Sequence, residues 1–248
     1  MSDVPRLFGS RAIVTGAANG IGEAIVRTFI KQGAGVVAVD SSESGVATMF
    51  KALKGVTPMV ASVTDKSSAE DLLKNASVKL EGLDIIVNNA AIQPPAPIGD
   101  TDEAALDAFL DRRIQLYALM ARAGLPFLSK SPAGRIINMG CVRSAFTLQG
   151  EQAYRRSQTA IAELTKALAA EAGAQGTTVN YIQPGAIMTH ASRRIFSEDK
   201  VLRDHCIAHS AAKRLGEALD VAKVALFLAS DDAVFVSGAG IAVDGGRV

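Results

Sequence analysis

Three glycines near the amino terminus have the spacing of a phosphate-binding turn. Gly16, Gly20 and Gly22 follow the apolar run 12–14 and lead into an amphipathic stretch. A strand, a glycine turn and a helix in this order can hold a dinucleotide. Gly16 would permit the tight turn, Gly20 the approach of the pyrophosphate, and Gly22 the packing of helix on strand. The G-x-x-x-G-x-G spacing also fits a plain strand-to-helix turn, so the glycines alone leave both interpretations open.

Asp40 adds a second element to this site. It closes the next apolar run, 35–39, at the carboxyl end of a predicted strand. A carboxylate there can accept both ribose hydroxyls of an adenosine and would repel a 2′-phosphate. Residues 17–19 include no Lys or Arg that would attract such a phosphate. We therefore predict NAD rather than NADP, and the alternative is that Asp40 only starts a turn with the two serines that follow it.

Tyr154 is the residue whose type and place suit proton transfer. It lies near the start of a predicted helix, thirteen residues after Cys141, which ends a buried strand. Strand ends that face one another at the carboxyl edge of a parallel sheet form the ligand crevice. We therefore expect Tyr154 beside Cys141, over a nicotinamide, although a lone tyrosine at a helix start is more often a packing residue.

Two more strand ends supply small or turn-forming residues. The segment 88–91, Asn-Asn-Ala-Ala, follows a buried run, and its amides fit a tie to a neighbouring strand as well as a ligand contact. Pro184-Gly185 turns the chain sharply after another run. Thr189, a few residues later, is placed to bond a nicotinamide carboxamide.

The polar segment 190–213 is predicted to be a mobile lid over a substrate. It carries all three histidines of the chain, His190, His205 and His209, and the simplest interpretation of each is a solvated surface residue. No pair of them has the spacing or the supporting carboxylates of a metal site, so we expect no metal.

The elements that must position these residues alternate regularly along the chain. Apolar runs rich in Val and Ile, without polar alternation, indicate strands buried on both faces. These runs are 12–14, 35–39, 57–61, 84–87, 135–139, 178–182 and 240–243. Helical patterns lie between them at 20–32, 43–53, 66–80, 102–129, 151–174 and 217–229. The alternation predicts one α/β domain over 1–248, a doubly wound seven-stranded parallel sheet of Rossmann type.

Composition excludes several other classes. Hydrophobic residues make up 48% of the 248, which is ample for a buried core. The net charge of +1 suggests neither nucleic acid nor a membrane surface as partner. Two cysteines make no disulfide framework, and no apolar run reaches the roughly 20 residues of a membrane span. We expect a cytoplasmic protein that acts on a small molecule.

Taken together, these stretches resemble the short-chain dehydrogenase/reductase family over nearly the whole chain. The matching pieces are 15–22, Asp40, 88–91, Tyr154, Pro184-Gly185 with Thr189, 214–217 and 243–246. The resemblance implies a homotetramer or homodimer, with helices around 102–129 and 151–174 pairing between subunits and the C-terminal strand region forming a second interface. It also implies NAD-binding positions at Gly16, Asn19, Gly20, Ile21, Gly22, Asp40, Ser62, Val63, Asn89, Ala90, Gln158, Pro184, Gly185, Ile187 and Thr189.

The family's usual catalytic set of Asn, Ser, Tyr and Lys is altered here. Only Tyr154 keeps its type, whereas Cys141 takes the Ser position, Gln158 the Lys position and Arg113 the Asn position. Ser62 stands where the family usually has an Asp that contacts the adenine. Because Gln158 brings no positive charge to lower the pKa of the tyrosine, ordinary carbonyl reduction should be slow.

Arginine is the residue type that could compensate. Besides Arg113, the arginines Arg143, Arg155 and Arg156 are close in sequence to the site. One guanidinium within ~4–6 Å of the tyrosine would lower its pKa, and it could also bind a substrate carboxylate or phosphate. The alternative is that Arg155 and Arg156 point to solvent or to an interface. Cys141 is more simply a small buried filler than a nucleophile.

Three functions remain open. The first is an NAD-dependent oxidoreductase that interconverts a secondary alcohol and a ketone by hydride transfer, with Tyr154 as acid and base, an altered proton relay and an anionic substrate. The second is a catalytically impaired NAD-binding sensor or partner subunit. The third is a non-redox enzyme on the same fold.

Overall fold

The computed structural model describes residues 5–51, 53–90, 102–143 and 150–247. A seven-stranded parallel sheet has the order β3-β2-β1-β4-β5-β6-β9. Its strands are β1 (Arg11–Thr15), β2 (Gly35–Asp40), β3 (Val56–Val60), β4 (Ile85–Asn88), β5 (Arg135–Met139), β6 (Thr178–Pro184) and β9 (Gly240–Val243). The predicted doubly wound sheet is therefore confirmed, and each predicted run overlaps its strand.

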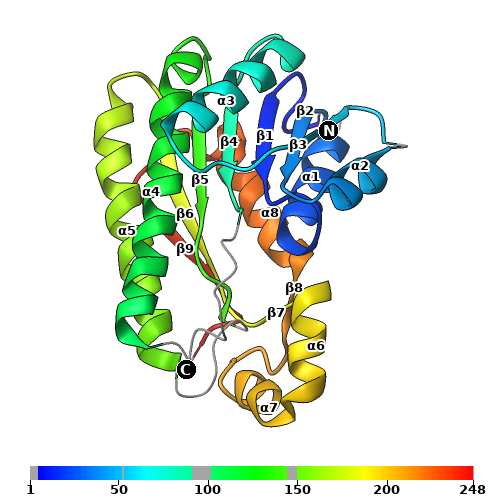
Figure 1. Ribbon diagram of the computed structural model, residues 1–248, viewed down its shortest axis with the longest axis vertical. Coiled ribbons are helices and arrows are strands. Elements are labelled where there is room, and N and C mark those ends of the chain that lie inside the picture. Colours follow the sequence, from blue (N-terminus) through cyan, green and yellow to red (C-terminus); the bar gives the residue numbers. More distant parts are fainter. Residues whose placement is uncertain (1–4, 52, 91–101, 144–149, 248) are drawn as a thin grey trace.

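Helices cover both faces of the sheet (Figure 1). One layer contains α1 (Gly20–Lys31), α2 (Glu43–Phe50) and α8 (Ala218–Ala229), and the other α3 (Lys66–Leu80), α4 (Glu103–Leu128) and α5 (Glu151–Gly173). Val36 packs into the first core and its neighbour Val37 into the second. Two buried faces explain why the strands read as continuous apolar runs. No helix in the described part of the chain is both long enough and apolar enough to cross a membrane.

The strand order reverses direction at β1, which lies between β2 and β4. After β1 the chain enters the glycine turn and α1, which covers one face of the sheet. The helix that follows β4, α4, covers the other face. In parallel sheets ligands bind at such a reversal, outside the carboxyl ends of the strands. The ends of β1, β2, β4, β5 and β6 therefore meet at one edge, as predicted.

Beyond this edge lies a small subdomain made of a helix pair and a two-stranded ribbon (Figure 1). It comprises β7 (Ile187–Met188), α6 (His190–Glu198), α7 (Lys200–Ala208) and β8 (Gly216–Glu217). Side chains cap both helices, because Thr189 accepts from the backbone of Ser192 and Asp199 from that of Leu202. The segment 190–213, interpreted from its polarity alone as a lid, is thus largely helical. Its movement over a substrate stays a prediction.

Candidate active site

The turn after β1 has the backbone that its glycines predict. Gly16 and Gly20 have φ of +65° and +55°, a region that L side chains rarely adopt. A Cβ on Gly22 would collide with the carbonyl oxygen of Gly16 and lie 2.7 Å from the Nδ2 of Asn89. Gly22 is thus required for packing of the helix against the turn itself, rather than against the strand as expected from sequence.

Asn89 ties the end of β4 to this turn. Its Nδ2 donates to the carbonyl oxygens of Thr15 and Gly16 at 3.0 and 3.1 Å. The backbone N–H groups of Asn89 and Ala90 donate to the hydroxyl of Thr15 at 3.1 and 3.0 Å. Of the two interpretations left open for these amides, the structure shows the tie between neighbouring strands. These bonds hold the turn in a fixed shape.

Asp40 is also bonded to the turn. One carboxylate oxygen accepts from the backbone N–H of Ala18 at 2.9 Å, and the other from that of Ser42 at 3.1 Å. The side chain is half-buried at the end of β2. The two bonds orient the carboxylate beside the glycine turn, and each oxygen keeps capacity for a further donor.

The other predicted cofactor positions lie along the same edge. Thr189 faces the turn, since a Cβ on Gly20 would lie 3.3 Å from the Cβ of Thr189. Asn19 precedes α1, the buried Ile21 follows Gly20, and Pro184 ends β6. Those remaining are Gly185 after β6, Ile187 in β7, and the exposed Ser62 and half-buried Val63 after β3.

Tyr154 lies in the first turn of α5 and is 1% exposed. Its hydroxyl donates to the carbonyl oxygen of Pro184 at 3.0 Å. It packs in one cluster with Cys141, Leu106 and Leu110. The predicted neighbourhood of Tyr154 and Cys141 is therefore present.

Two arginines stand over the ring of Tyr154. The guanidinium carbon of Arg143 is 5.6 Å from the ring centroid and that of Arg247 is 5.4 Å away. Burial nevertheless raises the pKa of Tyr154, although hydrogen bonds from Gln183 and Gln158 and the charge of Arg247 oppose it. The nearby guanidinium of Arg247 does act to lower this pKa, as expected, but desolvation of the phenolate outweighs the cation, so the pKa is raised.

The side chain of Arg113 extends from α4 to the end of β5. It is 7% exposed, and its guanidinium contacts the Sγ of Cys141. It also donates to the Tyr117 hydroxyl at 3.1 Å and to the Met139 carbonyl at 2.6 Å. Burial acts to lower the pKa of Arg113, but the interactions with Cys141 and Tyr117 raise it. Arg113 is therefore a permanent buried cation against Cys141.

Arg155 and Arg156 point away from the site. Arg155 contacts Glu151 at 3.2 Å with 75% of its side chain exposed, and Arg156 pairs with Asp107 at 2.9 Å. The alternative that they face solvent fits both. Gln158 is half-buried one turn after Tyr154 and lies close enough to bond it.

Sequence reasoning missed three residues of the site. Gln183 donates to the carbonyl oxygen of Cys141 at 2.7 Å and also bonds Tyr154. Glu151 contacts the guanidiniums of Arg247 and Arg143. Arg247 lies too far from Tyr154 in sequence for spacing to reveal it, whereas Gln183 directly precedes the Pro-Gly turn.

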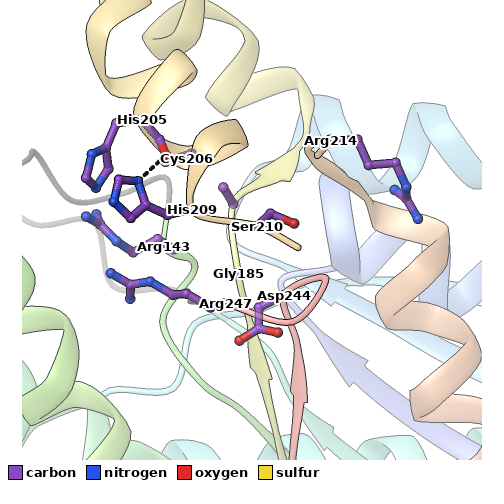
Figure 2. Close-up of a pocket in the computed structure, with 10 residues that line it drawn as sticks. Arg143, Gly185, His205, Cys206, His209, Ser210, Arg214, Asp244 and Arg247 are labelled. Atoms are coloured by element: carbon purple, nitrogen blue, oxygen red, sulfur yellow. Dashed lines mark hydrogen bonds between the residues drawn. The ribbon is translucent and has the colours of Figure 1, made fainter. Parts of the chain in front are cut away.

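A pocket opens between the end of β6 and α7 (Figure 2), and two of the arginines that line it are those that stand over the ring of Tyr154. It encloses about 360 Å³, part of it open to solvent. Its lining residues are Arg143, Gly185, Ala186, His205, Cys206, His209, Ser210, Arg214, Asp244 and Arg247. Two of the three histidines thus line a pocket, in which His205 is half-buried and His209 stays exposed.

Comparison with known proteins agrees with this fold. A family profile described as Enoyl-(Acyl carrier protein) reductase matches residues 16–247. The chain is 36% identical to the 3-oxoacyl-(acyl-carrier-protein) reductase FabG of Haemophilus influenzae, over 96% of this chain and 98% of the relative. It is 30% identical to FabG of Thermotoga maritima, over 98% and 99%. It is 34% identical to dehydrogenase/reductase SDR family member 4 of Oryctolagus cuniculus, over 95% and 92%.

The chain belongs to the short-chain dehydrogenase/reductase family. It is an oxidoreductase that acts on a CH–OH group or the corresponding ketone with a nicotinamide cofactor. The residues present fit such a cofactor, because Gly16 and Gly20, with positive φ, form a side-chain-free turn between β1 and α1, where a pyrophosphate would approach the amino terminus of the helix.

Proposed function

We propose that this protein is an NAD-dependent oxidoreductase that interconverts a secondary alcohol and a ketone, with Tyr154 as acid and base. The observation that carries the proposal is the common edge at which the glycine turn, Asp40 and Tyr154 meet. When bound, the nicotinamide supplies or accepts the hydride. The chain's own residues bind and orient the cofactor and the substrate, and they move the proton.

The preference for NAD rests on Asp40. Its carboxylate is oriented by the N–H groups of Ala18 and Ser42, at 2.9 and 3.1 Å. A carboxylate fixed at this place accepts hydrogen bonds from ribose hydroxyls, and its negative charge repels a 2′-phosphate. Ala17, Ala18 and Asn19 in the adjoining turn bring no opposing cation.

Tyr154 suits the role of proton donor. Because burial raises its pKa, the phenol is neutral at physiological pH and carries the proton that a developing alkoxide needs. Gln158 would hold the nicotinamide ribose by hydrogen bonds without lowering the pKa of the tyrosine as a lysine does. Arg113 and Cys141 would shape the wall of the site next to the substrate carbonyl.

A second function is supported by the burial of Tyr154. Its hydroxyl is bonded to the Pro184 carbonyl, and two arginines cover its ring. Such a tyrosine also fits a protein that binds NAD without turnover, as a sensor or partner subunit.

For the assembly we propose a homotetramer or homodimer that pairs α4 and α5 between subunits. For segment 190–213 we propose a lid over the substrate.

Binding and turnover measured on the same samples test the proposal. Calorimetry with NAD and NADH reports binding, and absorbance at the nicotinamide band reports turnover over a panel of secondary alcohols and ketones. We expect both in the wild type, and unchanged binding with a loss of turnover of roughly 10²–10⁴-fold in Tyr154→Phe. Binding without turnover in the wild type would favour the sensor, and equal turnover in Tyr154→Phe would remove Tyr154 from the mechanism.

A further inference from the structure

The pocket beside Tyr154 has two arginines side by side at its base. Figure 2 shows that the side chains of Arg143 and Arg247 extend in the same direction, below the rings of His205 and His209. Arg143 is 3% exposed, and its backbone N–H donates to the carbonyl oxygen of Gly185 at 3.0 Å. Both guanidiniums are also held over the ring of Tyr154. Two cations are thus fixed next to the proposed proton donor.

Among the residues that the structure describes, Glu151 is the carboxylate that pairs with these arginines. The carboxylate of Glu151 contacts three guanidinium groups. It makes a close hydrogen bond to Arg247, and it lies 3.5 Å from the guanidinium of Arg143 and 3.2 Å from that of Arg155. Asp244 is the single acid among the described residues that line the pocket. A carboxylate shared in this way leaves the cluster positively charged, which favours an anion from solution.

Two histidines form the opposite wall, and the positive charge of the arginines acts on His205. The rings of His205 and His209 lie 4.0 Å apart, and His209 Nδ1 is 2.9 Å from the carbonyl oxygen of His205. Burial and the charges of His209, Arg143 and Arg247 lower the pKa of His205, against a smaller effect of Glu151. The ring nitrogens of both histidines offer hydrogen-bonding groups across the pocket without adding negative charge.

We infer that this pocket binds the carboxylate of a small oxo or hydroxy acid, through the guanidiniums of Arg143 and Arg247. Planar guanidiniums suit a carboxylate because each can donate two parallel hydrogen bonds. With the acid group at the arginines, the carbonyl to be reduced would lie on the Tyr154 side of the same short molecule. That this acid is the substrate rests on the function proposed above, whereas the binding of the anion does not.

The three histidines of the chain allow a binding test without turnover. Butyrate and its neutral isostere butyramide are titrated against the protein while the ring protons of the histidines are followed by NMR. We expect butyrate to shift the signals of His205 and to raise its pKa, because the anion offsets the two arginines. Butyramide should do neither, and His190, which lies outside the pocket lining, serves as an internal reference.

Matched variants assign the effect to the pocket. In Arg247→Met and in Arg143→Met the affinity for butyrate should fall about tenfold or more, as expected on loss of one charged hydrogen-bond partner. Arg155→Met removes a guanidinium that shares Glu151 but does not line the pocket, and it should bind butyrate as the wild type does. Equal binding of butyrate and butyramide, or wild-type affinity in Arg247→Met, would overturn the inference.

A kinetic comparison separates this inference from the proposed function. Straight-chain oxo acids are compared with their methyl esters, and the acid should have the lower KM in the wild type but not in Arg247→Met. If neither acid nor ester turns over while butyrate binds at the arginines, the anion site stands and the proposed function fails. If esters turn over as well as acids, the function stands and the acid is not its substrate.

Discussion

The hydroxyl of Tyr154 donates its proton to the carbonyl oxygen of Pro184, 3.0 Å away. Pro184 ends β6, so the tyrosine is joined through this bond to the edge of the sheet where the cofactor positions lie. A phenol that donates to a carbonyl keeps its proton, because a phenolate would place two acceptors against each other. A substrate must therefore take over a hydrogen bond that the protein already makes to itself.

The first prediction concerns pH. Because burial raises the pKa of Tyr154 above its ordinary value, alcohol oxidation, which needs the phenolate, should speed up by about tenfold for each pH unit up to pH 10. Ketone reduction, which needs the neutral phenol, should be level between about pH 6 and 9 for the same reason. The measurement is kcat/KM in both directions across this range. An oxidation rate that levels off below pH 8 would mean that the pKa of the tyrosine lies well below its ordinary value of about 10.

The second prediction concerns the missing ammonium group. Gln158→Lys should lower the pKa of Tyr154 and so raise oxidation at neutral pH by roughly 10–100-fold, the effect of a one- to two-unit shift. The pH profile of kcat/KM should move to lower pH by the same amount. Gln158→Met, of similar length and without charge, is the control and should leave the profile in place. A faster Gln158→Met would show that the charge is not the cause.

The third prediction concerns the choice of cofactor. Asp40→Asn keeps an oxygen for the N–H of Ala18 but removes the charge that repels a 2′-phosphate. We expect the affinity for NADP to rise and that for NAD to fall, so that their ratio changes by about tenfold or more. Calorimetry with both cofactors measures the ratio, and thermal unfolding should change little. An unchanged ratio would mean that Asp40 serves only to shape the turn.

The fourth prediction concerns the close contact at Gly22. A Cβ there would collide with the carbonyl oxygen of Gly16 and press on Asn89, so Gly22→Ala should cost about 1–3 kcal/mol of folding free energy. It should also weaken NAD binding, since the turn must shift. Gly173→Ala, at a position with nothing within 4 Å of the added carbon, should be neutral or slightly stabilising in the same denaturation experiment.

The sheet was predictable because its strands are buried on both faces. Val36 and Val37 face opposite helix layers, and such strands appear in the sequence as unbroken apolar runs between helical patterns. The helices of segment 190–213 were not recognised. They have only nine residues each, too short for a clear apolar period, and the capping residues Thr189 and Asp199 were not recognised as helix starts.

Placement at the site was predictable where a residue ends a strand or follows a motif. Tyr154 and Cys141 lie together as expected, since both are near the carboxyl edge. The direction of the pKa of Tyr154 was not predictable, because spacing in sequence does not reveal that the side chain is 1% exposed. Arg247 was missed since only tertiary structure brings it beside Glu151.

The hydrogen bonds at Thr15 and Asn89 join two segments that lie far apart in the sequence. Thr15 belongs to β1 and Asn89 follows β4, yet four hydrogen bonds join residues 15 and 16 to residues 89 and 90. In each case a side chain of one segment bonds the backbone of the other, so a substitution at Thr15 cannot be compensated by one at Asn89. A change at either residue should therefore loosen both segments at once, and engineering of the glycine turn should leave Thr15 and Asn89 in place.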